Sequence, residues 1–309
     1  MKRRNRILVA APASSANLGC GFDVFAVALR KPKDRLTLQR AQSGVSITVK
    51  GPERLPEKPK ENVAGAVASA MMADYDVRGG ISMTLEKGVP VGSGLGSSAA
   101  SSVAAAVGTN ALFRLGISKR DLIKYAGIGE RVASGTAHYD NVAASLAGGF
   151  VVVGRDNDYV RMEPPASLAL CLVTPVVDLP KEKTRFARSL LPAEVPLQKM
   201  VDVTRAASLM VHGFAVGSIE EIGAAMTVSL VDERRAPMIP GLEEVRRAAM
   251  SEGAAGLCIS GAGPAVLAVC LRRSSDRVLG GMVRAFRLVG VESSGFVTGV
   301  GRGCVVIER

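Results

Sequence analysis

Apolar positions recur along the chain with two spacings, which predict a mixture of strands and helices. Residues 81–85 alternate between apolar and polar side chains, as in a strand with one buried face. Val103, Val107 and Ala111 recur at four-residue spacing in an alanine-rich run, as on one face of a helix. The other apolar runs predict strands over residues 7–11, 24–29, 34–38, 45–49, 149–154, 168–173, 257–260, 266–271 and 304–307, and helices over 61–72, 196–212, 241–252 and 275–288.

The order of these elements predicts an α+β chain with two domains, residues 1–160 and 161–309. The second domain follows the order β-α-β-β-α-β, which is typical of a ferredoxin-like domain. Two stretches are expected to be loops, because small polar residues fill 12–21 and charged residues fill 180–191. Ser118 and Ser218 are expected helix N-caps, since an acidic residue stands three positions after each.

A glycine-rich loop, VPVGSGLGSSAA from Val89 to Ala100, joins the strand at 81–85 to the alanine-rich helix. Free N–H groups at a helix start favour an anion, and glycines let the backbone approach a phosphate. Ser97 and Ser98 either cap the helix or reach a phosphate or a metal ion. The spacing matches neither a Walker loop nor a Rossmann loop, and a flexible linker is the alternative. The position between strand and helix favours a phosphate-binding loop.

The charge and composition bear on the partners of the chain. The 309 residues include 39 Lys and Arg against 28 Asp and Glu, a net charge of +11. The basic residues are mostly dispersed and aromatic residues make up 4%, so we expect attraction of an anionic nucleotide rather than a nucleic-acid surface. No apolar run has the length of a transmembrane helix. Five cysteines without a C-x-x-C pair indicate a reducing, cytoplasmic setting.

Further polar residues stand in glycine-punctuated or loop segments. Asn17 and Asp23 have a local explanation as turn formers, and Arg188 and Arg235 as exposed loop arginines. Glu130 is explained locally as a solvated helix charge. With Ser98, however, it would suit Mg²⁺, which takes one or two carboxylates together with substrate phosphates.

Taken together, these segments resemble the GHMP kinases, and the homoserine kinase branch of that family in particular. The glycine-rich loop matches the family's phosphate loop without a gap. The other matching segments are PASSANLGCGFD ending at Asp23, SGTAHYDNVA around His138, the segments 184–192 and 235–241, and SGAGP at 260–264. Cys20 and Ala26 stand where the branch usually has Pro and Gly, which bears on the fine geometry of the site.

The resemblance implies a first half like ribosomal protein S5 and transfer of the γ-phosphoryl group of ATP to L-homoserine, in threonine biosynthesis. It implies that Ser98 and Glu130 hold Mg²⁺, and that Asp23 and Asn141 join them in catalysis. The implied substrate-binding residues are Asn17, Asp23, His138, Asn141, Thr184, Arg188 and Arg235. The implied ATP-binding residues are Asn62, Pro90, Val91, Gly92, Ser93, Gly94, Leu95, Gly96, Ser97 and Ser98. The implied partners are L-homoserine and ATP, with no nucleic acid, no membrane and a homodimer as the expected assembly.

Three other functions stay open at this point. A sister kinase would act on another small alcohol, such as mevalonate or shikimate, and these substrates lack an amino group. A non-catalytic nucleotide sensor would share the fold, although the intact pair Ser98 and Glu130 argues against it. A nucleic-acid-binding protein is suggested by the net charge alone, and it would show steep salt dependence.

Overall fold

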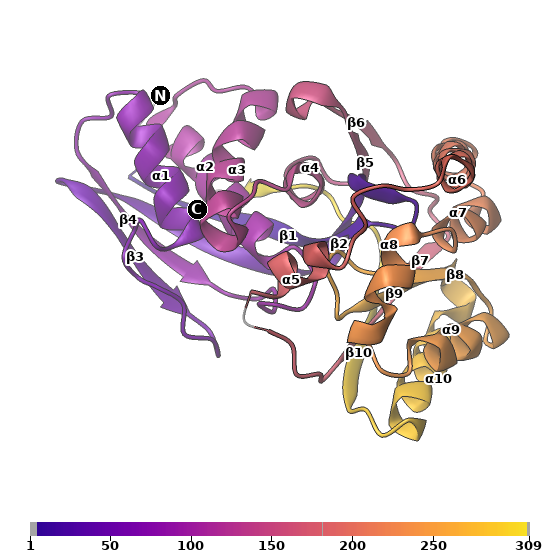
Figure 1. Ribbon diagram of the computed structural model, residues 1–309. Coiled ribbons are helices and arrows are strands. Elements are labelled where there is room, and N and C mark those ends of the chain that lie inside the picture. Colours follow the sequence, from indigo (N-terminus) through magenta and orange to yellow (C-terminus); the bar gives the residue numbers. More distant parts are fainter. Residues whose placement is uncertain (1–4, 181, 308–309) are drawn as a thin grey trace.

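The computed structural model describes residues 5–180 and 182–307, which form two β-sheets with helices packed against them (Figure 1). The expected α+β class is confirmed. In this described part, the larger sheet has seven strands in the order β11-β1-β2-β4-β3, with β5 paired to β2 and to β6. Its strands are β1 (Arg6–Asn17), β2 (Gly21–Ala41), β3 (Gly44–Lys50), β4 (Gly80–Glu86), β5 (Phe150–Val153), β6 (Tyr159–Met162) and β11 (Val305–Ile307).

Four helices lie over one side of this sheet (Figure 1). They are α1 (Val63–Asp74), α2 (Ser97–Phe113), α3 (Lys119–Ser134) and α4 (Tyr139–Ala147). The alanine-rich α2 contacts both β1 and β2. Ala99, Ala100 and Ala104 of this helix are fully buried, because small side chains allow close approach between a helix and a sheet. This packing fixes the N-terminal end of α2, where the glycine-rich loop ends.

The smaller sheet has the antiparallel order β10-β7-β9-β8. Its first strand lies beside its third, with the second and fourth at the edges, which is the ferredoxin-like arrangement expected from the sequence. The strands are β7 (Leu168–Pro175), β8 (Ala254–Ile259), β9 (Val266–Leu271) and β10 (Ser293–Thr298). The helices α9 (Leu242–Ser251) and α10 (Ser275–Leu288) pack against this sheet.

Both faces of the smaller sheet are buried, as the alternation along β7 shows. Leu168, Leu170 and Leu172 belong to the hydrophobic core that includes the larger sheet. Ala169, Cys171 and Val173, which alternate with them, belong to a second core with α9 and α10. The two sheets therefore share one core.

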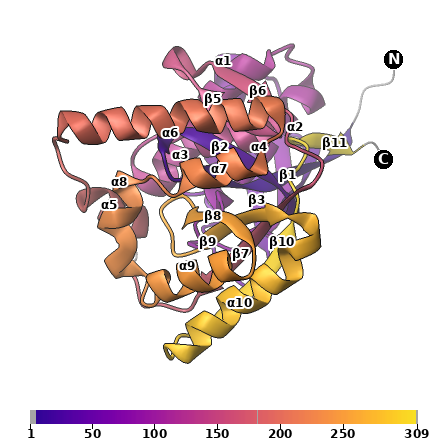
Figure 2. The same cartoon turned by 90° about the vertical axis from the view of Figure 1, so that its right-hand side faces the viewer.

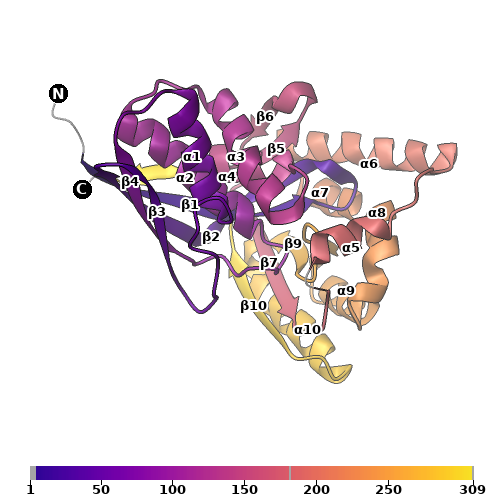
Figure 3. The same ribbon diagram turned by 60° about the vertical axis from the view of Figure 1, so that its left-hand side comes forward.

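A helical segment connects β7 to β8. It contains α5 (Lys183–Ser189), α6 (Leu197–Val216), α7 (Ile219–Met226) and α8 (Leu230–Arg235). Figure 2 shows the long α6 with α7 beneath it, and Figure 3 shows α5 beside α8. Phe214 of α6 stacks on Phe150 of β5 at a centroid distance of 3.9 Å. This contact joins the connecting segment to the larger sheet.

Two of the expected loops are wrong. β1 continues to Asn17, because Ser14, Ser15 and Ala16 are buried and pair with residues of β2. β2 is also one strand of 21 residues rather than two separate strands. The charged stretch 180–191 contains the helix α5. The stretches 12–17 and 180–191 lack a regular spacing of apolar residues, and contacts with distant segments determine their structure.

Other expectations are confirmed. α10 spans the expected residues 275–288, and the side chains of Ser118 and Ser218 accept backbone N–H bonds as N-caps. The last strand is an exception. The strand expected at 304–307 as the end of the second domain is β11, which pairs with β1 of the larger sheet, and the fourth strand of the smaller sheet is β10, which the sequence did not predict. The boundary between residues 160 and 161 stays a prediction. None of the described helices has the length and apolar character needed to cross a membrane.

Candidate active site

One cavity of about 740 Å³ brings together residues from both halves of the chain. It lies among the turn between β1 and β2, the glycine-rich loop, α3, α4, α5, α8 and the turn after β8. The residues singled out from the sequence that line it are Asn17, Asp23, Val91, Gly92, Gly94, Gly96, Ser97, Ser98, Glu130, His138, Asn141, Thr184, Arg188 and Arg235.

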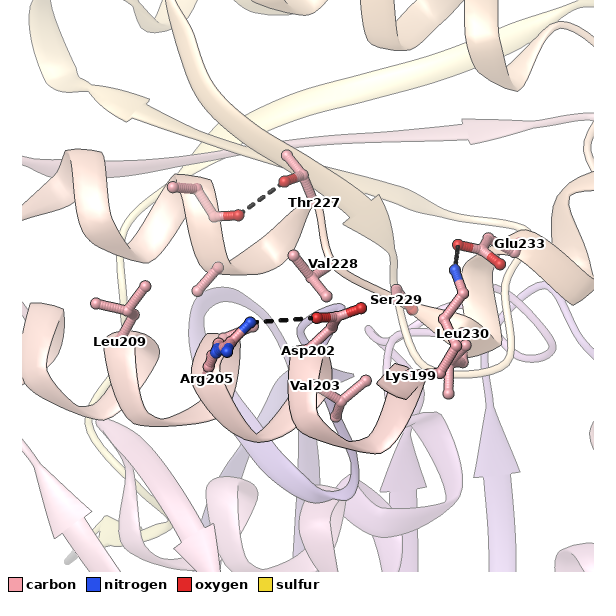
Figure 4. A pocket seen from close by; sticks show the side chains of 13 residues that line it. Lys199, Asp202, Val203, Arg205, Leu209, Thr227, Val228, Ser229, Leu230 and Glu233 are labelled. Atoms are coloured by element: carbon pink, nitrogen blue, oxygen red, sulfur yellow. Dashed lines mark hydrogen bonds and ion pairs between the residues drawn. The ribbon is translucent and has the colours of Figure 1, made fainter. Parts of the chain in front are cut away.

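A second hollow, beside α6, α7 and α8, has a different character (Figure 4). Its volume is about 440 Å³. Its charged side chains pair with one another, Lys199 with Glu233 at 3.3 Å and Asp202 with Arg205 at 3.6 Å. The larger cavity instead has glycine-rich backbone and the buried Glu130, whose Oε1 atom has no hydrogen-bond partner among the described residues, so we treat that cavity as the candidate active site.

The glycine-rich loop ends at the first turn of α2 with an unusually close contact. Gly96 is the N-cap of α2 and has a φ of +64°, a left-handed conformation that favours glycine. A Cβ at Gly96 would lie 2.2 Å from Ser14 Oγ and 2.8 Å from Asn141 Oδ1. Ser97 Oγ donates to the carbonyl of Val89 at 2.9 Å. The Ser97 side chain therefore closes the loop, and the first turn of α2, at Ser97 and Ser98, lines the cavity, where a helix start favours an anion.

A buried ion pair lies against the segment that contains the glycine-rich loop. Lys87 Nζ lies 2.5 Å from Asp34 Oδ2, and both side chains are almost fully buried. Lys87 also donates to the carbonyl of Ser97 at 3.2 Å, and Ser101 Oγ donates to Asp34 at 2.6 Å. The pair thus joins β2, the end of β4 and the first turn of α2. Sequence reasoning missed it, because the two residues are 53 positions apart.

Glu130 and Ser98 form the part of the cavity best suited to a cation. Glu130 is 5% exposed, and its Oε1 atom has no hydrogen-bond partner among the described residues. Burial raises the pKa of Glu130 to about 7, while a hydrogen bond from Ser98 opposes this rise and the charge of Asp140 adds to it. The described residues contain no cluster of three or more His, Cys, Asp and Glu side chains suited to a metal. A cation here would take its other ligands from phosphate and water, as Mg²⁺ does.

At the other end of the cavity, Asp23 and Arg188 form an ion pair. Arg188 Nη2 donates to both carboxylate oxygens of Asp23, at 2.8 and 2.7 Å. His138 Nδ1 lies 3.3 Å from the same Nη2 atom. Burial, followed by the charge of Arg188, lowers the pKa of His138, so its ring is neutral near pH 7. Asn17 Oδ1 accepts from the backbone N–H of Asp23 at 3.2 Å and so orients the acid.

Arg235 is buried in the wall of this end, rather than exposed in a loop. It is 3% exposed, and its Nε and Nη1 atoms donate to the carbonyls of Ala187 and Gly261 at 3.2 and 2.9 Å. The Arg188 and Arg235 guanidinium carbons lie 5.2 and 5.6 Å from the ring centroid of Phe22. Phe22 was not singled out from the sequence, although it stands within the motif that ends at Asp23.

Asp140 and Asn141 lie where α4 begins, between the two ends of the cavity. Asn141 Oδ1 accepts from Ser14 Oγ at 2.8 Å. Asp140 Oδ1 accepts from the backbone N–H of Asn141 at 2.6 Å. Burial raises the pKa of Asp140 to about 6. Ser14 is a second residue that sequence reasoning missed, because the stretch around it was expected to be a loop.

Four residues expected to bind ATP, Asn62, Pro90, Ser93 and Leu95, do not line the cavity. Asn62 is the N-cap of α1, where its Oδ1 accepts from Ala64 and Gly65. Ser93 Oγ donates to the carbonyl of Pro90 at 2.8 Å, and Leu95 is buried in the core. Pro90, Ser93 and Leu95 thus contribute to the backbone geometry of the loop. A role of Asn62 in binding ATP stays a prediction.

Comparison with known proteins matches the chain to one family over nearly its full length. Residues 62–149 match the family model "GHMP kinases N terminal domain", and residues 210–287 match "GHMP kinases C terminal". The chain is 42% identical to a homoserine kinase from Natronomonas pharaonis, over 96% of this chain and 98% of that protein. It is 40% identical to one from Haloarcula marismortui, over 97% of this chain and 99% of that protein.

Solved structures agree. The crystal structure of a homoserine kinase from Cytophaga hutchinsonii has a TM-score of 0.92 and 33% identity, and the match covers 99% of both chains. A mevalonate kinase from L. major has a TM-score of 0.70 at 17% identity, which shows a shared fold alone. The motifs, the ferredoxin-like sheet and the near full-length relatives lead to one conclusion: the chain belongs to the GHMP kinase family and, within it, to the homoserine kinases.

Proposed function

We propose that this chain transfers the γ-phosphoryl group of ATP to the side-chain hydroxyl of L-homoserine, giving ADP, O-phospho-L-homoserine and a released proton, a step of threonine biosynthesis. One observation carries the proposal. A single cavity contains both the start of α2 at Gly96, which would bind phosphate, and the ion pair of Arg188 with Asp23, which would bind the amino acid. The family relationship supports the same reaction.

At the phosphate end, the N–H groups at the start of α2 would bind the triphosphate. Ser98 and Glu130 would hold Mg²⁺, which when bound neutralises charge on the transferred phosphoryl group. The unpartnered Oε1 of Glu130 supports this assignment, since a buried acceptor without a partner is costly in a folded protein. Phosphoryl transfer needs positioning and charge stabilisation more than covalent chemistry, and these residues supply both.

At the amino-acid end, an α-amino acid brings one charge of each sign. Arg188, with the remaining donors of Arg235, would bind its carboxylate, because a guanidinium matches a carboxylate in shape. Asp23 and Asn17 would face its ammonium group, and Thr184 and His138 complete this part of the wall. The two members of one ion pair, Arg188 and Asp23, would thus bind the carboxylate and the ammonium group of the substrate.

Asn141 would orient the hydroxyl that attacks the phosphoryl group. Its side chain accepts from Ser14 and is fixed against Gly96, so it lies beside the phosphate loop. An amide cannot accept the hydroxyl proton, so Asn141 acts by orientation. Asp140, next to it, is buried and bonded to the backbone N–H of Asn141, and we assign it to holding that residue in place.

The proposal also includes the domain division, the assembly and the location of the chain. The phosphate-binding part would correspond to residues 1–160 and the ferredoxin-like part to 161–309, with β11 as a return of the chain to the first sheet. We expect a homodimer in the cytoplasm. Sedimentation analysis of the purified chain tests the assembly.

The experiment that tests the function is an ADP-release assay with MgATP and a panel of alcohols. The panel contains L-homoserine, L-serine, L-threonine, mevalonate and shikimate. We expect the highest kcat/KM with L-homoserine. A higher kcat/KM with mevalonate or shikimate would assign the chain to a sister activity, and ADP release with none of them would indicate a nucleotide sensor.

A further inference from the structure

Lys183, the first residue of α5, connects this helix to two glycine-rich turns. Its Nζ atom donates to the carbonyl of Gly92 in the phosphate loop at 2.5 Å, and it also contacts the carbonyl of Gly263 in the turn after β8. The side chain lines the catalytic cavity. Lys183 therefore meets the phosphate loop from the opposite half of the chain.

The helix that begins with Lys183 also carries two residues of the amino-acid end. Thr184 and Arg188 stand four positions apart on one face of α5, and both line the cavity. A helix of seven residues is marginal on its own, and α5 has no side-chain N-cap. Tertiary contacts such as those of Lys183 therefore decide where Thr184 and Arg188 lie relative to the phosphate loop.

The chemistry of the ammonium group suits an anion at this place. A lysine ammonium has three N–H donors, and backbone carbonyls take two of those of Lys183 among the described residues. One donor is left for a ligand in the cavity. Without the ammonium, the carbonyl oxygens of Gly92 and Gly263 would present partial negative charge to a triphosphate, and the ammonium reverses that sign.

We propose that Lys183 is a nucleotide-binding and positioning residue, which holds α5 against the phosphate loop and gives its remaining N–H to a phosphate oxygen of ATP. The proposal rests on the proposed function in taking ATP as the ligand. It adds a residue that no motif of the sequence singled out.

The surroundings of Lys183 make its charge sensitive to pH. Burial, followed by the charge of Arg235 on α8, lowers the pKa of Lys183 to about 8. The two turns that it contacts, Gly92–Ser98 and Gly261–Pro264, contain no titratable side chain. On its own helix, Arg185 pairs with Glu182 at 3.1 Å. The ammonium is therefore present at pH 7 and is lost as the pH rises through about 8.

Besides Glu182, Arg185 and Arg235, the other ionisable groups that line the cavity are Asp23, Glu130, Arg131, His138, Asp140 and Arg188. The pKa values of Glu130 and Asp140 are raised to about 7 and about 6, and that of His138 is lowered. Glu130 becomes more ionised above pH 7, which favours metal binding, whereas Lys183 loses its charge, so a fall in MgADP affinity between pH 7 and pH 9 has the sign expected for Lys183 and not for Glu130.

The test measures MgADP binding by calorimetry, without homoserine, together with kcat and KM for ATP. Lys183→Met keeps the length of the side chain and removes its charge, whereas Lys183→Arg keeps the charge at both pH values. At pH 7 we expect Lys183→Met to weaken MgADP binding by roughly tenfold or more, the effect of one charged hydrogen bond, and Lys183→Arg to recover most of it. Between pH 7 and pH 9, the affinity for MgADP should fall in the wild type and should not fall in Lys183→Arg.

Lys199→Met is the matched control, because Lys199 lies on α6 outside the cavity and pairs with Glu233. Wild-type affinity in Lys183→Met, or equal losses in Lys183→Arg and Lys183→Met, would overturn the proposal. If Lys183→Met does not fold, the change in MgADP affinity between pH 7 and pH 9, compared between the wild type and Lys183→Arg, tests the proposal instead. Failure of the wild type to phosphorylate homoserine, with MgADP binding still dependent on Lys183, would instead overturn the proposed function.

Discussion

Asp23 and Arg188 meet across the candidate active site although 165 positions separate them in the chain. One guanidinium nitrogen, Nη2, donates to both carboxylate oxygens of Asp23. The two side chains are 42% and 40% exposed, so the pair contributes little to stability but lies where a ligand can reach it. An α-amino acid brings a carboxylate for Arg188 and an ammonium for Asp23, so it can exchange partners with this pair without leaving a charge alone.

The first prediction concerns the substrate carboxylate. Arg188→Leu should lower kcat/KM for homoserine by roughly 10–150-fold, since a charged hydrogen bond contributes roughly 1.5–3 kcal/mol. The analogue 3-aminopropan-1-ol has the hydroxyl and the amine but no carboxylate, so the same variant should change its use little. Arg188 is a cleaner probe than Arg235, whose removal would also leave the carbonyls of Ala187 and Gly261 without their donor.

Steady-state kinetics with both alcohols check this prediction. Arg205→Leu serves as control, because Arg205 lies on α6 and is 71% exposed. The assignment fails if Arg188→Leu prefers homoserine over the analogue by the full wild-type factor.

The second prediction concerns Glu130 and pH. The pKa of Glu130 is higher in the folded chain, about 7, than the usual 4.5, so the folded chain holds a proton that the unfolded chain releases between these values. Ionisation of Glu130 therefore lowers the free energy of unfolding progressively as the pH rises from 4.5 to about 7. The gap corresponds to about 3 kcal/mol, taken as an upper limit.

Glu130→Gln should accordingly remove most kinase activity and yet raise the thermal stability at pH 8, with no gain at pH 4. Thermal unfolding between pH 4 and pH 8 and activity at limiting Mg²⁺ check the two effects. Unchanged turnover at limiting Mg²⁺ would rule out the metal role, and unchanged stability at pH 8 would contradict the burial argument.

The third prediction compares two glycines of the same loop. Gly96 and Gly92 both have positive φ, +64° and +70°, so Ala at either position meets a similar backbone cost of about 1–2 kcal/mol. A Cβ at Gly96 would also collide with Ser14 and Asn141, whereas a Cβ at Gly92 meets nothing within 4 Å. Gly96→Ala should therefore lower kcat at least roughly tenfold more than Gly92→Ala, because it displaces Asn141. Equal kcat values in the two variants would show that the contact with Asn141 has no catalytic importance.

The fourth prediction concerns the ion pair beneath the loop. Asp34→Ala leaves the buried ammonium of Lys87 without its counter-ion, and removing one partner of such a pair costs about 3–5 kcal/mol. Asp158→Ala is the matched control, because the Asp158 pair with Arg120 is 48% and 67% exposed and contributes about 0–1 kcal/mol. Urea unfolding of both variants gives the comparison. Similar losses in the two would mean that the buried pair does not support the loop.

The sequence allowed the elements with local patterns to be predicted better than the segments between them. The glycine-rich loop before α2 and the N-caps Ser118 and Ser218 are local patterns, and α10 has an apolar face that marks both of its ends. The strand through Ser14–Ala16 could not be predicted in this way, because small polar residues carry no apolar period and are buried by neighbours from distant segments. α5 was missed for a similar reason, since its place depends on Lys183 and Arg235 rather than on its own sequence.

The burial of Arg235 could also not be predicted from the sequence. Arg235 stands in a segment that suggests a surface loop, yet it is 3% exposed because two backbone carbonyls and the ring of Phe22 surround its guanidinium. The pairing of Asp34 with Lys87 likewise follows from the register of β2 against β4, which no local pattern specifies.

The central claim is that the cavity transfers a phosphoryl group to the hydroxyl of homoserine rather than to water. The most direct test is ³¹P NMR of a reaction that contains the wild-type chain, MgATP and L-homoserine. The account predicts that O-phosphohomoserine and ADP appear in equal amounts, with inorganic phosphate at background. ADP that appears with inorganic phosphate in place of O-phosphohomoserine, or ATP that stays intact, would contradict it.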